Sequence, residues 1–591
     1  MIRTPLRAAL RFARSGCLGL ATVAALASTV PAATEPEKVL PDSTLFFFKV
    51  KNAAEFREGF KQSQFGQLLA DPAVKPLTDD IFKKLEQQSK MLKEKFGVTL
   101  DELAKLPQGP AHIAVVTKSG GKIPIAVLVT ADAGKNEKTM TDVMVKATKQ
   151  AEEANAKVGT ESYKGLTLHI VQPPKDGDKP NPPLIWTNAG PIFHIATDVE
   201  ALKDVLSHAD GRSTSLESVD SFVKSKAKLG AEAPVGWFFD INKAIKLAVR
   251  TAGAKNPGAA NIEGILDQVG VNGLKSAAGT FTFNTGAFDS VSKVFFLAPA
   301  PTQGVLKLFM MPPTNLRPEP WVPATVASYQ TMSWELDGAY DALNELVNNF
   351  QPGMLNLLEQ QLVGPNGGEP LSLKKDVFGP LGDRLTLISD FKKPIKEDSQ
   401  RLLLGIALDD SKAFTNTLTK ILGMTGANPA KRDFNGTTIY DFKLPEMPAN
   451  PNGGNNPFKN GTATLAIAKD TLFLATEPGL LEATLQGGSS ALADSPSFQA
   501  VAKQVPAKTS SLTYARSDEQ ARVTYDTIKS GQFEQAFKNQ PGGPDVSKVI
   551  DKSKIPDFSV FAKYLSEGGG FGLMEEDGVT FTNFTLKKMN P

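Results

Sequence analysis

The chain contains four histidines, which are the natural starting point in a search for acid–base or metal chemistry. They are His112, His169, His194 and His208, all in the first half. The first three stand inside apolar runs that predict strands, where a packed histidine is commoner than a ligand or a general base. No two have the spacing of metal ligands. The histidines therefore predict no catalytic, cofactor-binding or metal-binding residue.

Other motifs that carry chemistry are also missing from the sequence. It holds no G-x-S-x-G elbow, no H-E-x-x-H pair and no phosphate-binding G-x-x-x-x-G-K-[ST] loop. The glycine-rich stretch 568–572 is not followed by a predicted helix, so it is interpreted as a strand lead-in. The segment 176–178 is too short for a calcium loop, and the acids at 409–410 and 575–577 are interpreted as solvated turn residues. We expect no cofactor and no enzymatic activity.

The first 34 residues predict a secretory signal peptide. Four arginines without an acid precede an apolar stretch at about 18–30, which is shorter than the ~20 residues of a spanning helix. Cleavage is expected after about Ala32, although retention as an anchor stays open. Cys17 would leave with the signal, so the mature chain would hold no thiol and no disulfide. The predicted location is periplasmic or extracellular.

The composition of the mature chain excludes two classes of partner. Removal of four arginines leaves 65 − 4 = 61 basic residues against 63 acidic ones, a net charge of −2. Such a balance gives nucleic acid no electrostatic advantage. No later segment is long and apolar enough for an integral membrane span. A mature length of 591 − 32 = 559 residues predicts two or more domains.

The second half of the chain repeats the first, according to a comparison of the sequence with itself. Four matches occur in one order with nearly constant shifts: Val98 with Leu371 (371 − 98 = 273), Tyr163 with Phe434 (434 − 163 = 271), Ala196 with Ala475 (475 − 196 = 279) and Ser218 with Asp494 (494 − 218 = 276). The first two shifts place Leu385 opposite His112 and Tyr440 opposite His169. A site built on the shared fold would therefore not use the histidines.

Each half has a pattern of strands and helices that predicts an α+β domain. The expected strands are 45–50, 113–116, 125–129, 184–187, 192–196, 235–240, 326–330, 511–515 and 579–586; the expected helices are 78–96, 136–154, 199–207, 243–249 and 519–528. Because short turns join many strands, we expect a mainly antiparallel sheet with helices packed on one face. The predicted domains are 33–313 and 314–591, after the signal peptide 1–32.

Two turn-rich loops, 172–183 and 445–457, stand at matching places in the two halves. They are rich in proline, asparagine and glycine and poor in apolar residues, which predicts exposure. Either they bind a partner, or they are tolerated length variation at a hairpin.

Several short segments resemble an exported bacterial family that is catalogued only as a domain of unknown function. They are the opening Pro41-Asp42-Ser43-Thr44-Leu45, the hairpin Tyr163-Lys164-Gly165, Ala475-Thr476-Glu477 and Ser495-Pro496-Ser497-Phe498. The resemblance spans most of the mature chain as a tandem duplication. It implies no activity, cofactor or site residue.

Three hypotheses for the function remain open. The first is a non-enzymatic protein that binds or scaffolds an unknown envelope or extracellular protein or ligand. The second is a carrier of an apolar ligand held between sheet and helices, suggested by 35 phenylalanines. The third is an exported hydrolase with an unrecognised pair of carboxylates.

Overall fold

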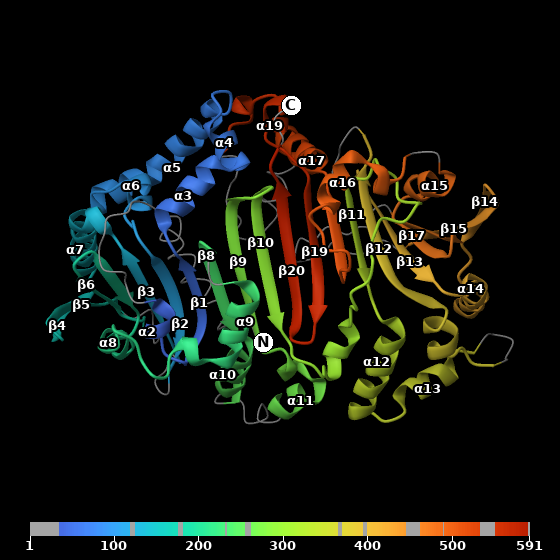
Figure 1. The fold of residues 1–591 in the computed structure, drawn as a ribbon, viewed down its shortest axis with the longest axis horizontal. Helices are drawn as coiled ribbons and strands as arrows, with labels where there is room; N and C mark the ends of the chain where they lie inside the picture. The colour runs from blue at the N-terminus through green and yellow to red at the C-terminus, as the bar shows by residue number, and fades with distance from the viewer. Residues whose placement is uncertain are drawn as a thin grey trace. The chain divides into compact units, whose positions relative to one another are not determined.

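The computed structural model of the chain is shown in Figure 1. It describes residues 35–118, 124–174, 181–230, 233–253, 262–363, 369–393, 399–444, 461–487, 490–531 and 550–588. The predicted signal peptide 1–32, the centre of the loop 172–183 and the whole loop 445–457 lie outside these residues.

The chain divides into two compact units. The first comprises the described residues of Met1–Pro257, Lys275–Gly286 and Ser292–Leu297. The second comprises those of Gly258–Leu274, Ala287–Val291 and Ala298–Pro591.

The first unit is built on an antiparallel sheet. Its strands pair in the order β9-β8-β1-β2-β3-β7-β6-β5-β4. Their bounds are β1 Thr44–Val50, β2 Ala111–Thr117, β3 Ile125–Asp132, β4 Lys157–Tyr163, β5 Leu166–Gln172, β6 Leu184–Ala189, β7 Ile192–Ala196, β8 Val235–Asp240 and β9 Ser276–Thr285. The residues of a further strand, β10 (Phe288–Leu297), are divided between the units.

Except for α2, which precedes β1, the helices of the first unit lie in the connections between these strands. They are α2 Pro36–Val39, α3 Ala53–Gln62, α4 Gln64–Ala70, α5 Lys75–Phe96, α6 Leu100–Ala104, the 3₁₀ turn η1 Gly134–Asn136, α7 Glu137–Glu153, α8 Val199–Ser207, η2 Leu216–Ser218, α9 Asp220–Leu229 and α10 Ile241–Gly253.

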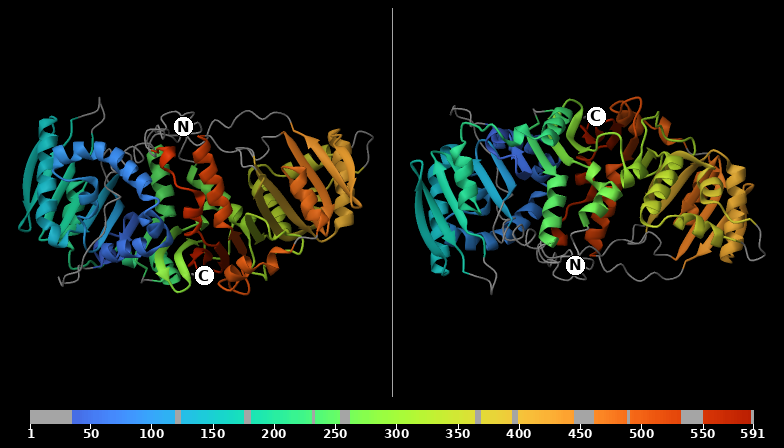
Figure 2. Two further views of the ribbon diagram at one scale, coloured as in Figure 1. Left: turned by 90° about the horizontal axis from the view of Figure 1, so that it is seen from above. Right: turned by 90° about the horizontal axis from the view of Figure 1, so that it is seen from below.

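Helices cover both faces of this sheet, so the prediction of helices on one face is wrong. Phe47 and its neighbours on one face pack with α8 and α9. Trp186 and Phe193 point to the opposite face, where α7 covers them, and α3 covers Val50 there. The physical reason is that successive strand residues alternate between faces, and both sets here are apolar enough to need cover. The turned views in Figure 2 allow these helices to be followed on either side of the strands.

The second unit has an antiparallel sheet of the same kind. Its strands pair in the order β20-β19-β18-β11-β12-β13-β17-β16-β15-β14. Their bounds are β11 Ser328–Ser333, β12 Leu381–Phe391, β13 Gln400–Leu408, β14 Ala430–Phe434, β15 Thr437–Lys443, β16 Thr462–Ala468, β17 Thr471–Ala475, β18 Ser511–Ala515, β19 Gly568–Glu575 and β20 Gly578–Leu586.

The helices of the second unit lie before β11 or between its strands, and α11 and η4 come from the segment between β8 and β9. They are α11 Ile262–Val269, η4 Val271–Gly273, η5 Gly304–Phe309, α12 Leu336–Phe350, α13 Met354–Gln361, the π-helical turn η6 Leu373–Phe378, α14 Ser411–Thr425, α15 Pro478–Gln486, η7 Leu492–Asp494, α16 Pro496–Ala502, α17 Ser517–Ser530, η9 Lys552–Lys554 and α19 Phe558–Ala562.

The strands β1 to β9 pair in the same order as β11 to β19. Each sheet forms one network of paired strands, and equivalent side-chain hydrogen bonds show which residues of the two networks correspond. The Thr197 hydroxyl accepts from the Val127 N–H at 2.9 Å, and the Thr476 hydroxyl accepts from the Leu402 N–H at 3.0 Å. We call two residues, one in each unit, matched when they hold the same place in this network.

An aromatic triplet is matched in the same way. In the first unit Phe222 of α9 packs edge-on against Phe238 and Phe47, with ring centroids 5.2 and 6.3 Å away. In the second unit Phe498 of α16 packs against Tyr514 and Tyr329 at 5.7 and 6.4 Å. Each triplet joins a helix to the apolar core of its unit.

Many of the predicted elements are confirmed. Helix α8 and strands β8 and β18 have the predicted bounds. Gly97 ends α5 with a positive φ of 78°, a left-handed conformation that is common for a glycine after a helix. Within the described residues, no helix is long and apolar enough to cross a membrane.

Candidate functional site

Two of the four histidines lie in one row across the sheet of the first unit. His112 on β2 and His194 on β7 both pair with Thr130 of the intervening strand. Burial lowers the pKa of His112 to about 3, helped by the charges of His194 and Lys49. Burial also lowers the pKa of His194 to about 4. Both are therefore neutral near pH 7, and the Thr130 hydroxyl lies 3.0 Å from Nδ1 of His194.

The other two histidines have structural surroundings. His169 stacks on Trp186 with 4.0 Å between ring centroids, and burial lowers its pKa. His208 caps the end of α8, with Nδ1 2.8 Å from the Asp204 carbonyl oxygen. Among the described residues, no group of three or more His, Cys, Asp or Glu is placed to hold a metal ion.

The remaining sequence features also have structural places. Asp410 accepts the Ala413 N–H at 2.8 Å and caps α14. The acids at 575–577 form the turn between β19 and β20, and the glycines 568–572 belong to β19. The segment 176–178 lies outside the described residues.

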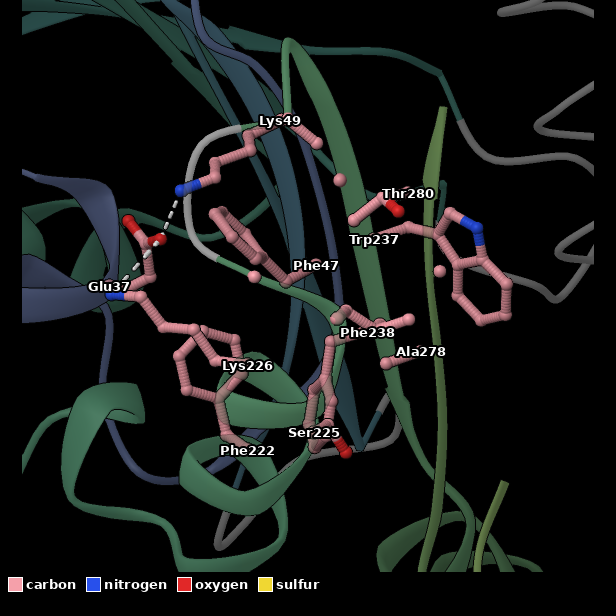
Figure 3. A pocket seen from close by; sticks show the side chains of 15 residues that line it. Glu37, Phe47, Lys49, Phe222, Ser225, Lys226, Trp237, Phe238, Ala278 and Thr280 are labelled. Atoms are coloured by element: carbon pink, nitrogen blue, oxygen red, sulfur yellow. Dashed lines mark hydrogen bonds and ion pairs between the residues drawn. The ribbon is translucent and has the colours of Figure 1, made fainter. Parts of the chain in front are cut away.

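A pocket in the first unit brings together charged residues that the sequence analysis did not single out (Figure 3). We name it the Glu37 pocket; its volume is about 50 Å³. Its lining residues are Glu37, Phe47, Lys49, Phe222, Ser225, Lys226, Leu229, Gly230, Ala233, Gly236, Trp237, Phe238, Ala278, Gly279 and Thr280.

Glu37 is held over the sheet by the short helix α2. Its side chain is 1% exposed. The next turn of chain is anchored, because the Leu216 N–H donates to the Leu40 carbonyl at 2.9 Å and Leu40 is fully buried. A buried carboxylate requires a compensating charge or hydrogen bonds.

Two lysines supply that compensation. Lys49 of β1 donates a hydrogen bond to Oε1 of Glu37, and the Lys226 ammonium of α9 lies 3.9 Å from the same oxygen. Lys226 also lies 3.4 Å from Glu217. The other oxygen of Glu37, Oε2, is buried and has no hydrogen-bond partner in the described part of the chain.

The walls of the pocket are aromatic. In Figure 3 the ring of Phe47 lies between the two lysine side chains, and the rings of Phe222 and Phe238 lie below it. The indole of Trp237 points to the other side of the strand, where a Cβ added to Gly279 would lie 2.4 Å from its Nε1. Trp237 therefore contributes backbone to the pocket and keeps its ring outside.

The pocket is open because small residues stand at two places on its floor. Gly236 and Thr280 are paired on β8 and β9, and a Cβ added to Gly236 would have no neighbour nearer than 3.8 Å. Their matched residues are Leu512 and Phe571. Leu512 is 2% exposed and Phe571 packs on the same core. Larger side chains therefore occupy these two places in the second unit.

The second unit has its own ion pair at the matched place, with both side chains partly exposed. The Arg384 Nε lies 2.9 Å from Oε1 of Glu319, and the Tyr329 hydroxyl donates to Oε2 at 3.3 Å. The Thr386 hydroxyl donates to Oε1 at 2.5 Å. Burial, with the charge of Glu319, raises the pKa of Tyr329. The carboxylate here is hydrogen-bonded through both oxygens.

The sequence does contain a signal for this site. Pro36-Glu37 and Pro318-Glu319 are related by a shift of 319 − 37 = 282, with Pro41 and Pro323 at the same shift. A proline-flanked glutamate at equivalent places could have marked the pair. Strand pairing matches His112 with Thr386, so the prediction that Leu385 stands opposite His112 is wrong by one residue.

Comparison of the chain with protein-family models, with curated proteins and with solved structures finds no match.

Proposed function

We propose that this chain is an exported, non-enzymatic binding protein built from two copies of one α+β domain, with the Glu37 pocket as its binding site. Its predicted place is the periplasm or the cell surface. The proposal retains the resemblance to an exported bacterial family of unknown function, and it leaves the partner or ligand to be found in the envelope or outside the cell.

Export is supported by the order of residues at the amino terminus. Arginines without acids, a short apolar stretch and Val30-Pro31-Ala32 follow one another as in a cleavable signal. The duplication is supported by the common pairing order of β1–β9 and β11–β19 and by the matched hydrogen bonds of Thr197 and Thr476.

The observation that carries the proposed activity is the Glu37 pocket. Small-molecule sites are concave and mainly apolar, with a few polar groups that orient the ligand. This pocket combines aromatic walls with two lysines and a buried carboxylate. Both lysines retain partial access to solvent, with 21% and 26% of their side chains exposed.

The test is retention of small molecules by the purified chain. The protein would be mixed with the small-molecule fraction of its own cell envelope, filtered, and analysed by mass spectrometry. We expect compounds that the wild-type chain retains and that Gly236→Leu does not, because leucine copies Leu512 and fills the pocket. Circular dichroism and hydrogen exchange would establish that the variant folds.

The outcomes separate this function from the alternatives. Retention of neutral apolar compounds would favour the apolar carrier, and turnover of a retained compound would favour the hydrolase. Equal retention by both proteins, or retention by neither, would remove the Glu37 pocket as the binding site.

A further inference from the structure

We infer that strand β4 of one molecule pairs antiparallel with strand β14 of a second copy of this chain. A sheet edge in the first unit of one copy would thereby bind a sheet edge in the second unit of the other copy. The contact uses neither the Glu37 pocket nor a ligand, so it is independent of the proposed function.

Strands β4 and β14 are each the last strand of a sheet. Among the described residues, β4 pairs with β5 alone and β14 pairs with β15 alone. Most residues of both strands are exposed, and Figure 1 shows each strand at the edge of its sheet. Such an edge offers a row of backbone N–H and C=O groups with which another strand can pair.

The hairpins that follow β4 and β14 determine which backbone groups point outward. Each hairpin has a two-residue turn, Lys164-Gly165 or Asn435-Gly436. The residues beside such a turn bond to each other, and bonded and non-bonded residues then alternate along the strand. The outward backbone groups therefore belong to Val158, Thr160 and Ser162 on β4 and to Lys431 and Asp433 on β14.

One antiparallel register joins these outward groups. It sets Thr160 opposite Asp433 of the second copy, and Ser162 opposite Lys431 of the second copy. Each of these opposed pairs exchanges two backbone hydrogen bonds. Lysine on an edge strand commonly discourages pairing, but here the Ser162 hydroxyl can accept from the Lys431 ammonium, and the Thr160 hydroxyl can donate to the Asp433 carboxylate.

The same register sets Glu161 directly opposite Arg432 of the second copy. In their own units, Glu161 pairs with Lys203 of α8 at 2.6 Å and Arg432 pairs with Glu482 of α15 at 2.7 Å. These ion pairs are matched, because each helix residue stands five places after its N-cap (203 − 198 = 5 and 482 − 477 = 5). Their charges are reversed, however. Pairing of the two edges would therefore align Lys203, Glu161, Arg432 and Glu482 with alternating sign.

The residues on either side of this ion pair are complementary in size. Gly159 would lie opposite Phe434 of the second copy, and Tyr163 opposite Ala430 of the second copy. In each case a small residue leaves room for an aromatic ring, and an aromatic residue opposite a glycine stabilises a pair of strands.

Pairing of β14 with a second β14 is unfavourable by comparison. Every register that joins its outward groups sets Lys431, Arg432 or Asp433 opposite the same residue of the other copy. Like charges directly opposite each other destabilise a pair of strands. The mixed pair of β4 and β14 has no such opposition, so we expect β14 to bind β4.

The experiment uses the intact chain and two edge variants, Thr160→Pro and Lys431→Pro. Proline here removes an N–H that points outward, so the hydrogen bonds of the strand to its own sheet remain. Because a contact of this size is weak, sedimentation would be measured up to about 0.5 mM protein. We expect the wild-type mass to rise with concentration beyond that of a dimer, since a head-to-tail contact repeats.

Each proline variant alone should stay monomeric, because only one kind of edge remains in it. An equimolar mixture should form a heterodimer that does not grow, because the intact β14 of Thr160→Pro binds the intact β4 of Lys431→Pro. Thr160→Val keeps the N–H and should associate as the wild type does. Circular dichroism and hydrogen exchange of β5 and β15 would establish that the variants fold.

A second pair of variants leaves the backbone unchanged. Glu161→Gln removes the charge opposite Arg432 and should weaken self-association about threefold, as for an exposed ion pair. Glu200→Gln is the matched control, because Glu200 also pairs with Lys203, at 3.1 Å, but belongs to α8 and not to the edge. It should leave self-association unchanged.

Four results would overturn the inference. The first is a wild-type chain that stays monomeric over the whole range of concentration. The second is self-association of Lys431→Pro, which would show that β4 pairs with a second β4, and the third is self-association of Thr160→Pro, which would show the same for β14. The fourth is a mixture of the folded proline variants that stays monomeric.

Discussion

One row of residues crosses the sheet of each unit, and the two rows have opposite chemistry. In the first unit it reads Lys49, His112, Thr130, His194 and Thr187. In the second unit the matched residues are Thr331, Thr386, Gly405, Phe473 and Ala466. The first row contains three groups that can carry a positive charge, and the second contains none.

The difference concerns only the side chains of the row and not the backbone pairing of the strands. The backbone pairs are the same in both units, so the side chains of this row are not what determines the pairing. Each row has to fill space beside the adjacent apolar core, and it can do so with imidazole, hydroxyl or phenyl groups. The row is therefore a place where one unit can acquire titratable groups and border a pocket without a change of fold.

The largest expected difference between the units is their response to acid. His112 and His194 have folded-state pKa values of about 3 and 4 against an ordinary 6.5. Below about pH 6.5 the unfolded chain takes up protons that the folded unit does not, so stability is full above that pH and falls towards pH 4. At about 1.4 kcal/mol per pKa unit, the loss is several kcal/mol.

Hydrogen exchange resolved by peptide would measure this loss in each unit. We expect β2 and β7 to lose protection between pH 7 and pH 4, and β12 and β17 to change less. His112→Thr and His194→Phe, which copy Thr386 and Phe473, should flatten the dependence in the first unit. An unchanged slope in that double variant would contradict the prediction.

The next effect concerns Gly236 on the floor of the pocket and its matched residue Leu512. Leu512→Ala should cost the second unit about 2–5 kcal/mol, because it leaves a cavity beside the core. Gly236→Ala should change the first unit by less than about 1 kcal/mol, because its Cβ meets nothing nearer than 3.8 Å. Hydrogen-exchange protection of β18 and β8 measures the two losses of stability. Equal losses would mean that the surroundings of Leu512 and Gly236 are equally tightly packed.

A smaller effect is expected at the ion pairs of Glu37 and Glu319. Lys49→Met should cost about 2–4 kcal/mol, since it leaves Glu37 with the more distant Lys226. Arg384→Met should cost about half as much, because hydroxyl groups of Tyr329 and Thr386 still donate to Glu319. Urea unfolding followed in each unit by exchange would compare the two. A larger loss of stability for Arg384→Met than for Lys49→Met would contradict this prediction.

The smallest effect is in the matched hairpins. Lys164 and Asn435 both adopt a left-handed conformation, with φ of 50° and 52°, before a glycine. Asparagine tolerates this conformation better than lysine. We expect Lys164→Asn to stabilise the first unit, and Asn435→Lys to destabilise the second, by about 0.5 kcal/mol each. Thermal unfolding measures both shifts, and shifts of the same sign would refute the explanation.

Local patterns in the sequence predict much of this fold because short-range physics determines them. The helix at 199–207 begins where Asp198 accepts the Ala201 N–H, and the hairpin at Lys164-Gly165 follows from its turn residues. The antiparallel sheet follows from the many short connections. The packing of helices such as α7 on the second face was missed because apolar residues on both sides of a strand do not reveal which side a helix covers.

The Glu37 pocket was missed for a different reason. Its two lysines come from positions 12 and 189 residues after Glu37 (49 − 37 = 12 and 226 − 37 = 189). Glu37 on α2, Lys49 on β1 and Lys226 on α9 meet only because α2 and α9 cover the same face of the sheet. The openness of the floor depends on which residue of β9 stands opposite Gly236, and strand register at that range cannot be read from one sequence.

The central position of β1 has a consequence for the order in which the chain can assemble. Its second neighbour, β8, begins 235 − 50 = 185 residues after β1 ends. Until that segment is made, one edge of β1 is unpaired, and this strand carries Phe46-Phe47-Phe48. The matched strand β11 is separated from its second neighbour, β18, by almost as many residues. Its sequence, however, is Ser-Tyr-Gln-Thr-Met-Ser. An unpaired apolar edge recruits other chains, so we expect a nascent first unit to depend on a holding chaperone and a nascent second unit to need little such protection.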